Sequence, residues 1–365
     1  MYKAKAKPID EKLSERIKST NWSQMPLALI GFDVYVDVNG DVGFYEGNSV
    51  PFALGDYNSM YGGDLNEAIV SGLKGKGLIG INISPDTELR SARNYNGSFA
   101  AMLCHRNGID YVAGRPSTLK WDKKKKQFYF DDEGTKKRFD FLFNRCPGSV
   151  RRLMKIVPQK DWLTAPVASP IVYSAILSDK FETSSALREL GLDSPLSYIV
   201  NNPDERVRAM KKVAKHIREN HPDYVEPFIF IKPVNGTGAR GARVLRDEKS
   251  KPSRVFDYPC LVTERITTFP LNNYGSNHMV DARMFYFNGH ASHSIGRVAP
   301  LSVENAGIND GKAFSKRAFV TNLCQGGSTT RFDPTLENTL REYVLAAALA
   351  IDDASKKYME KLNGK

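Results

Sequence analysis

The sequence predicts an α/β protein that folds into a few packed lobes. Hydrophobic residues make up 41% of the 365 positions, which is the content of an ordinary globular protein and not of a disordered one. Residues 27–48 alternate apolar and polar side chains, which indicates a half-buried pair of strands. Residues 204–220 and 335–361 instead repeat their apolar positions at the spacing of a helix face. Strand and helix signals thus occur along one chain, as α/β lobes require.

The clearest strand signal lies near the N-terminus. Apolar and polar side chains alternate from Phe32 to Val38, and Asn39-Gly40 follows, which is the strongest short signal for a hairpin turn. If this pair forms a two-residue turn, Asp33 faces Glu46 across the hairpin, with Asn48 two residues further on the same face. Two carboxylates and an amide oxygen form a hard-oxygen site that suits Mg²⁺. A plain hairpin with a wet polar face would show the same pattern.

Residues from about 66 to 170 predict a small α/β unit of short strands, helices and loops. Lys123–Lys126 form the densest basic run there, between Trp121 and a strand-like QFYF stretch. The chain then turns at DDEG and returns, which predicts a β-hairpin with an exposed, lysine-rich arm. The unit also carries arginines that either bind an acidic substrate or are solvated, namely Arg90, Arg93, Arg145, Arg151 and Arg152.

Two later segments could handle phosphate groups. In FIFIKPVNGTGARGARVL (228–245), Lys232 ends a predicted strand and supplies a point charge. A glycine-rich loop follows, whose backbone N–H groups could approach phosphate oxygens closely; it contains Gly236, Thr237, Gly238 and Gly241. The loop is not a P-loop, because GK[ST] is absent, and it does not open a helix as a dinucleotide fingerprint does. Lys180 opens the helix predicted over 178–190 and is either a second phosphate ligand or an ordinary solvated lysine.

The net charge of +11, from 52 basic and 41 acidic side chains, leaves the partner open. It fits a nucleic-acid-binding protein, and it equally fits a site for phosphates and carboxylates. Against nucleic acid, the aromatic residues are not interleaved with the basic runs as stacking platforms would be. The four cysteines form no CxxC pair, no signal peptide opens the chain, and no apolar stretch reaches about 20 residues. A cytoplasmic protein without a membrane partner is expected.

Arranged together, these pieces resemble the ATP-grasp superfamily of carboxylate–amine ligases. DKFETSSALRELGLDSP (179–195) looks like the segment that carries a first ATP lysine, here Lys180. FIFIKPVNGTGARGARVL looks like the second lysine, here Lys232, with the phosphate loop. The predicted strand LVTERI resembles the hinge that holds adenine, which places at the matching positions Glu264, Arg265 and Ile266.

Three further segments extend the resemblance. DARMFYFNG resembles the strand after the hinge, whose acid, here Asp281, contacts ribose and whose Arg283 points into the site. NLCQGG, which begins at Asn322, resembles the asparagine-and-glycine segment of the ribosomal-protein glutamate ligases. The N-terminal hairpin resembles the metal hairpin of D-alanine–D-alanine ligases, with as implied metal ligands Asp33, Glu46 and Asn48.

The order of these segments departs from that of the family. The metal hairpin usually comes last, whereas here it opens the chain and the long helix closes it, so the sequence resembles a circularly permuted member. The resemblance implies an ATP-grasp fold with a Rossmann-like domain before the nucleotide-binding part. It divides the chain into a hairpin segment, a substrate domain, a lid lobe and the rest of the core lobe, over residues 1–54, 55–170, 171–268 and 269–365.

The resemblance implies an ATP-dependent ligase that joins a small carboxylate to an amine through an acyl phosphate, with an amino acid or a small peptide as substrate. It also implies ATP and two Mg²⁺ ions, with Mn²⁺ as a substitute. The implied catalytic residues are Arg283, Arg297 and Asn322. A kinase for small alcohols would use the same nucleotide site, and a nucleic-acid-binding protein would use the basic charge instead, so both alternatives stay open.

Overall fold

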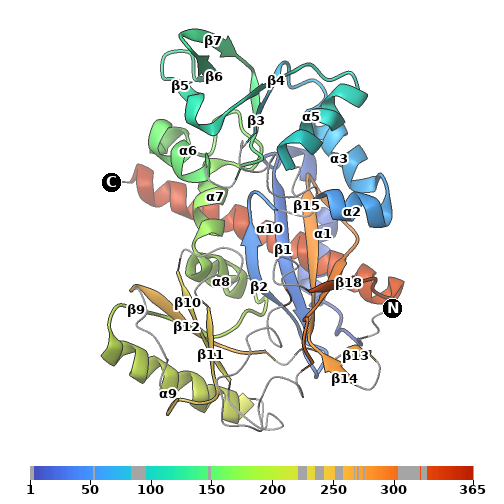
Figure 1. Cartoon of the computed structure of the whole chain (residues 1–365), viewed down its shortest axis with the longest axis vertical. Coiled ribbons are helices and arrows are strands. Elements are labelled where there is room, and N and C mark those ends of the chain that lie inside the picture. The colour runs from blue at the N-terminus through green and yellow to red at the C-terminus, as the bar shows by residue number, and fades with distance from the viewer. Residues whose placement is uncertain are drawn as a thin grey trace.

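The computed structural model describes most of the chain, and the description below covers only these residues: 4–51, 54–83, 96–146, 149–220, 228–234, 242–250, 258–266, 268, 271–273, 276–302, 321 and 327–364. They form helices and strands of a mixed α/β molecule in which three groups of elements are visible (Figure 1). None of the helices in these ranges combines the length and apolarity needed to cross a membrane.

The first group is built on an antiparallel sheet in the order β18-β17-β15-β1-β2, with β16 paired to β15. Its strands are β1 (Leu29–Val36), β2 (Val42–Asn48), β15 (Val280–Phe287), β16 (His290–Ala291), β17 (Ile295–Val298) and β18 (Ser328–Thr330). The helices that pack with it are α1 (Glu11–Ser19), α7 (Ile171–Ser178), α8 (Lys180–Glu189) and α10 (Pro334–Asn363). The N-terminal hairpin and the C-terminal helix therefore belong to one lobe.

The second group is an antiparallel sheet in the order β11-β10-β12-β9. Its strands are β9 (Ser197–Val200), β10 (Ile229–Pro233), β11 (Arg243–Leu245) and β12 (Cys260–Glu264). Helix α9 (Pro203–Asn220) covers one face, because its apolar side chains pack with those of β10 and β12 in a separate small core. A two-stranded ribbon of β13 (Leu271–Asn273) and β14 (Ser276–His278) follows.

The third group contains a parallel sheet in the order β4-β3-β8, with the strands β3 (Ile79–Asn82), β4 (Tyr111–Gly114) and β8 (Phe141–Phe143). The helices around it are α2 (Leu54–Tyr61), α3 (Asp64–Leu73), α5 (Asn96–Arg106) and α6 (Val150–Ile156). The basic arm is a three-stranded antiparallel sheet of β5 (Leu119–Asp122), β6 (Gln127–Asp132) and β7 (Thr135–Arg138). Short 3₁₀ helices lie at η1 (Trp22–Gln24), η2 (Pro116–Thr118) and η4 (Gln159–Asp161).

The predicted helices have clear physical starts. The carboxylate of Asp179 accepts hydrogen bonds from the backbone N–H groups of Phe181 (2.9 Å) and Glu182 (3.2 Å), so Asp179 caps α8. Asp333 caps α10 in the same way, through the N–H of Thr335, with a proline at the first helical turn. Lys180 is therefore the first residue of its helix, as the sequence predicts.

The turn of the N-terminal hairpin differs from the prediction. Val36 pairs with Val42, so the connection is longer than two residues. Asp37 organises it, because its Oδ1 accepts from the N–H groups of Asn39 and Asp41, at 2.8 Å each. A bulge between Asp33 and Val34 then shifts the register. The shift restores the predicted pairing of Asp33 with Glu46, which is confirmed although the predicted two-residue turn is wrong.

The two ends of the described chain meet along α10. The side chain of Arg16 in α1 donates to Asp353 in α10 at 2.7 Å. The hydroxyl of Tyr343 lies 3.4 Å from the carbonyl oxygens of both Lys7 and Pro8. The inner face of β1 and the buried face of α10 also share the main hydrophobic core. The N-terminal segment is thus fixed to the closing helix before it enters the sheet.

Candidate functional site

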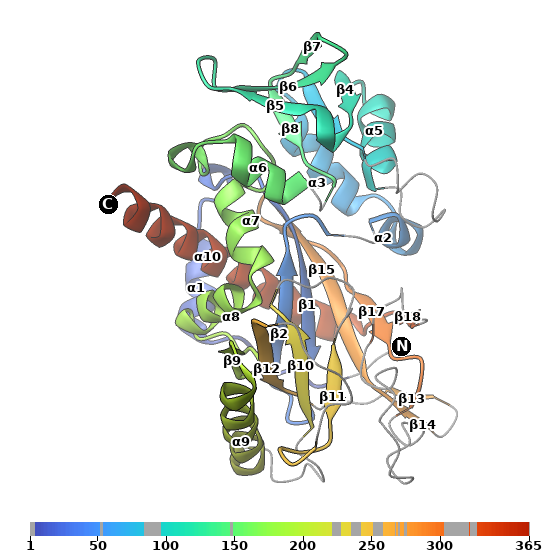
Figure 2. The ribbon, with the colours of Figure 1, turned by 60° about the vertical axis from the view of Figure 1, so that its left-hand side comes forward.

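A pocket opens between the sheet that contains β1, β2 and β15 and the sheet that contains β10 and β12. Figure 2 shows the ribbons of these two sheets. Its empty volume is about 970 Å³, the open mouth included. Most of its charged lining residues come from the first sheet, from the start of α8 and from β10. Among the residues that line it are Asp33, Tyr45, Glu46, Lys180, Phe230, Lys232, Thr263, Glu264, Arg265, Ile266, Thr268, Met279, Asp281, Arg297 and Thr321.

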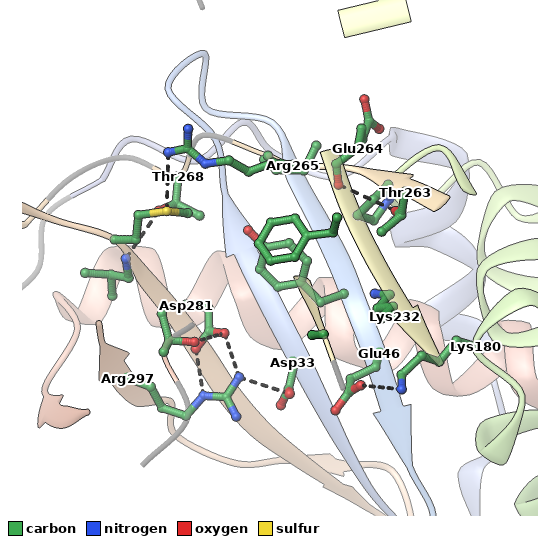
Figure 3. Close-up of a pocket in the computed structure, with 18 of the residues that line it drawn as sticks. Asp33, Glu46, Lys180, Lys232, Thr263, Glu264, Arg265, Thr268, Asp281 and Arg297 are labelled. Carbon is green, nitrogen blue, oxygen red and sulfur yellow. Dashed lines mark hydrogen bonds and ion pairs between the residues drawn. The ribbon is translucent and has the colours of Figure 1, made fainter. Parts of the chain in front are cut away.

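Asp33, Asp281 and Arg297 form one wall of the pocket, and Arg283 stands behind it. Arg283 holds Asp33 with two hydrogen bonds, Nε to Oδ1 at 2.7 Å and Nη2 to Oδ2 at 2.8 Å. Arg297 binds Asp281 in the same two-fold manner, at 2.7 and 2.6 Å, and its Nη2 also lies 3.0 Å from Asp33 (Figure 3). Cross-strand pairing places these four side chains together, since Asp33 faces Arg283 and Asp281 faces Arg297. The cluster is electrically balanced.

The two arginines keep the carboxyl group of Asp33 ionised. Burial alone would raise the pKa of Asp33, but the charges of Arg283 and Arg297, and their hydrogen bonds, lower it to about 2. For Asp281, burial raises the pKa more than its pairing with Arg297 lowers it, and Thr321 donates a further hydrogen bond at 2.5 Å. A carboxylate that is held ionised and aimed at a cleft can bind a cation.

Glu46 stands beside Asp33 and toward the lysines. Its Oε2 lies 3.9 Å from Nζ of Lys180, and its Oε1 accepts from the side-chain amide of Asn48 at 3.4 Å. The Asp33, Glu46 and Asn48 oxygens are the hard donors that Mg²⁺ takes. Among the described residues no three His, Cys, Asp or Glu side chains converge on a metal position. The donor set fits an ion that completes its shell with water or phosphate oxygens and shares Asp33 with the arginines.

Two lysines meet at the far side of the acidic pair. Lys232 is the last but one residue of β10 and lines the pocket, and Lys180 opens α8 with 14% of its side chain exposed. Burial, and then the positive charge of Lys180, lower the pKa of Lys232 to about 8, while Glu46 acts in the opposite sense. Lys180 and Lys232 thus make this end of the pocket positively charged, with Glu46 as the nearby counter-charge.

The polar groups of Glu264 bind the end of β12 to Leu196. The backbone N–H of Glu264 donates to the carbonyl of Leu196 at 3.0 Å, and Oε1 of Glu264 accepts from the N–H of Leu196 at 2.6 Å. Its Oε2 lies 3.4 Å from Nε2 of His216. Burial raises the pKa of Glu264 to about 7. The Glu264 carboxylate thus fastens the segment, whereas the apolar surface beside it comes from Phe230, Ile266 and Met279.

The pocket brings together most of the residues predicted from the sequence. Those that line it are Asp33, Glu46, Lys180, Lys232, Glu264, Arg265, Ile266, Asp281 and Arg297. Asn48 and Arg283 stand directly behind this lining, through their contacts with Glu46 and Asp33. The predicted phosphate loop and the predicted catalytic asparagine lie outside the described residues, at Gly236, Thr237, Gly238, Gly241 and Asn322.

The sequence alone gives no reason to place several of the lining residues in the pocket. Thr321 reaches the pocket through its bond to Asp281, and Tyr45 occupies the bulge of the hairpin. Phe230 and Met279 are ordinary apolar residues of a strand and a strand entry. Each depends on tertiary placement, and only the alternation in FIFIKP could have suggested that Phe230 and Lys232 share a face.

The arginines predicted from the sequence in the third group differ from one another in burial. Arg151 is exposed, and Arg152 is half-buried and donates to the carbonyl of Leu119 at 3.0 Å. Arg145 is buried with 3% of its surface exposed, which excludes the solvated alternative for this residue. Arg90 and Arg93 lie outside the described residues.

No protein-family model and no curated protein matches the sequence. The chain is similar in structure to several solved proteins. One, from Methylobacillus flagellatus KT and described provisionally as a gamma-glutamylcysteine synthetase, is 12% identical, covers 96% of this chain and 93% of its own, and gives a TM-score of 0.59. D-alanyl-alanine synthetase A from Vibrio cholerae O1 biovar eltor str. N16961 is 11% identical, with 75% and 80% covered and a TM-score of 0.45.

The ATP-grasp ligase PsnB, complexed with a minimal precursor, is 13% identical, with 75% and 82% of the two chains covered and a TM-score of 0.44. The likeness to the Methylobacillus structure extends over almost the whole of both chains and establishes the fold. The mixed α/β class and the ATP-grasp fold predicted from the sequence are confirmed.

Proposed function

We propose that the protein is an ATP-dependent carbon–nitrogen ligase that joins a small carboxylate to an amine. The observation that carries this proposal is the pocket itself, where two lysines face two carboxylates that are flanked by arginines. A polyphosphate fits the lysines, a divalent cation fits Asp33 and Glu46, and a second anionic group fits the arginine side. The fold shared with a synthetase supports the same assignment.

In this proposal ATP lies along the pocket. Adenine contacts the apolar surface of Phe230, Ile266 and Met279, and the backbone of Glu264–Ile266 reads its edge. Asp281 lies on the ribose side. Lys180 and Lys232 bind phosphate oxygens, together with the backbone N–H groups of the loop Gly236–Gly241. Binding restores a counter-charge to the buried ammonium of Lys232, whose pKa burial has lowered.

The reaction begins when a substrate carboxylate attacks the γ-phosphorus and ADP leaves. The acyl phosphate then reacts with an amine nitrogen, phosphate leaves, and an amide forms. Arg297 faces the pocket and steadies the negative charge that develops on the acyl group, while Arg283 keeps Asp33 ionised and oriented. Asn322 is assigned to the same step. Asp33, Glu46 and Asn48 would hold Mg²⁺, as one ion or two, which would supply the charge that neutralises phosphate oxygens during the transfer.

We also propose that the chain is a circular permutation of the usual ATP-grasp order. In support, β1 pairs with β15, on the opposite side from β2, and α10 packs with the same sheet. The hairpin thus completes the core lobe from the N-terminal side. The boundaries 1–54, 55–170, 171–268 and 269–365 remain our proposal for the hairpin segment, the substrate domain, the lid lobe and the remaining core lobe.

The proposal is tested by ADP release. Pairs of amino acids, and of an amino acid with a small peptide, are incubated with ATP and Mg²⁺, and ADP and phosphate are measured. A ligase releases both only when a carboxylate and an amine are present together. A stable phosphorylated product from one acceptor would instead identify a kinase.

Glu46→Gln should lower the rate of ADP release by at least about 100-fold, because the variant loses the carboxylate that fits the metal. Its circular dichroism spectrum should match that of the wild type. The matched control is Glu67→Gln, a change to an exposed residue of α3, which should leave the rate unchanged. A Glu46→Gln variant with a near-normal rate removes the hairpin from the mechanism.

A further inference from the structure

Arg145 is a buried cation whose donors are mostly open. It follows β8, and 3% of its surface is exposed. Nη2 donates to the carbonyl oxygen of Pro51 at 2.8 Å, and the guanidinium lies over the ring of Phe143, 5.6 Å from the centroid. Nε and Nη1 are also buried, and neither has a hydrogen-bond partner in the part of the chain that the structure describes. A charged group in this state is costly unless an anion joins it.

Arg297, unlike Arg145, has acidic side chains as partners. Arg297 is as deeply buried, and it is paired with both Asp281 and Asp33. Arg145 has no carboxylate within salt-bridge distance among the described residues. Burial accordingly lowers the pKa of Arg145 to about 9, with no acidic side chain acting against it. Among the described residues, the interior does not supply a counter-ion for Arg145.

The polar residues around Arg145 bind one another and hold its backbone. The side-chain nitrogen Nδ2 of Asn82 donates to Oδ1 of Asn144 at 2.6 Å and to Oγ of Ser149 at 2.9 Å. The side-chain oxygen Oδ1 of Asn82 accepts from the backbone N–H of Arg145 at 2.7 Å. This network fixes the residue at the carboxyl ends of the parallel strands β3 and β8. That edge of an open α/β sheet is where ligands bind.

The position also faces the metal hairpin. Pro51 lies against Gly31, since a Cβ on Gly31 would stand 2.4 Å from Cβ of Pro51. Gly31 pairs with Asn48 at the end of β2. The three residues from Asn48 to Pro51 span at most about 11 Å. A molecule that reached from the hairpin to Arg145 would therefore have the size of an amino acid or a dipeptide.

We propose that Arg145 binds the carboxylate of a substrate, namely a carboxylate that does not react and that anchors an amino acid or a small peptide. The identity of this anion as a substrate group rests on the proposed ligase function, whereas the anion site rests on the burial and open donors of Arg145 alone. A guanidinium offers a planar pair of N–H donors that matches a carboxylate. Because Nε and Nη1 of Arg145 are buried, their pairing with a bound carboxylate would be strong.

The first test needs no catalysis. Thermal unfolding is followed in sodium chloride, sodium acetate and sodium phosphate at equal ionic strength. Acetate, as a carboxylate probe, should raise Tm of the wild type above its value in chloride by about 2 °C or more. Arg145→Met should lose this acetate effect, and its Tm in chloride should be no lower than that of the wild type, because an unpaired buried charge has been removed.

Two further variants sharpen this test. Arg151→Met, which changes an exposed arginine nearby in the sequence, should keep the acetate effect. Arg145→Lys keeps the charge but loses the planar fork, so it should retain the fold with a smaller effect. A lower Tm of Arg145→Met in chloride would show that Arg145 is a structural strut to Pro51, and an effect of phosphate without one of acetate would show a phosphate site. Either result overturns the proposal.

The second test uses the amino acid that ADP release identifies, compared with its carboxamide. The wild type should prefer the carboxylate form, and Arg145→Met should raise KM for it by at least about 10-fold with a small change in kcat. The variant should treat the two forms alike. If no amino-acid pair releases ADP, the ligase function fails while the acetate result still decides the anion site. Retained discrimination in Arg145→Met would contradict the proposal.

Discussion

At the scale of single residues, Lys232 shows how the pocket is prepared for an anion. Its ammonium is buried beside Lys180, and the pKa of Lys232 is lowered to about 8. A cation in this state destabilises the fold below that pH, and in the function that we propose a bound phosphate would offset this cost. The sequence could indicate this lysine, because it ends a strand before a glycine-rich loop. It could not indicate Thr321 or the burial of Arg145, which depend on how distant segments pack.

Lys232→Met should weaken ATP binding at least about 10-fold, since a charge-assisted contact is lost. The same variant should be more stable than the wild type at pH 7. The folded wild type titrates near 8 and the unfolded chain near 10.5, so the unfolded state holds more protons between these values and wild-type stability rises with pH there. Calorimetry and thermal melts at pH 7 to 10 measure both effects. Lys211→Met, at an exposed position of α9, is the control that should change neither.

Glu264 has the opposite pH dependence. Burial raises the pKa of Glu264 from 4.5 to about 7, so the folded state keeps a proton that the unfolded state has lost between these values. Stability should therefore fall as pH rises from 4.5 to 7. Glu264→Gln keeps the bond to Leu196 but cannot ionise, so it should gain on the order of 1–3 kcal/mol above pH 7 relative to the wild type. Equal pH profiles of unfolding for the two proteins would contradict a raised pKa.

At the scale of elements, the N-terminal hairpin shows which parts of the fold the sequence predicts and which it does not. The alternation of residues 32–38 predicts the strand, and the pairing of Asp33 with Glu46 is correct. The turn is not, because the carboxylate of Asp37 captures two backbone N–H groups and enlarges it. A bulge further along the hairpin compensates. The predicted helices fare better, since their caps and apolar faces are local signals.

Gly40 is the residue on which this turn depends. Its φ is +84°, and a Cβ there would lie 2.4 Å from the carbonyl oxygen of Lys5. Gly40→Ala should cost about 2–4 kcal/mol and loosen the hairpin. Gly134→Ala is the matched control, because Gly134 has φ +87° with nothing within 4 Å, so it should cost about 1 kcal/mol. Denaturant unfolding compares the two, and equal losses would mean that Lys5 does not pack on the turn.

At the scale of the whole molecule, the pocket is assembled from segments far apart in the chain. The acidic pair comes from the N-terminal hairpin, the lysines come from α8 and β10, and Arg297 comes from β17, while Arg283 of β15 stands behind the lining. The sequence could predict this set because a resemblance linked the motifs, not because spacing did. The hairpin pairs with β15 and shares the main hydrophobic core with α10, so strands from the N-terminal part and from the later part of the chain form one sheet.

The central claim is that the N-terminal hairpin supplies the metal end of a nucleotide site. The most direct measurement is calorimetric binding of ATP with and without Mg²⁺, to the wild type and to Glu46→Gln. Mg²⁺ should tighten ATP binding to the wild type by about 10-fold or more, and Glu46→Gln should lose most of that gain while it still binds ATP through the lysines. An equal gain in both proteins would show that the metal binds elsewhere, and the claim would be wrong.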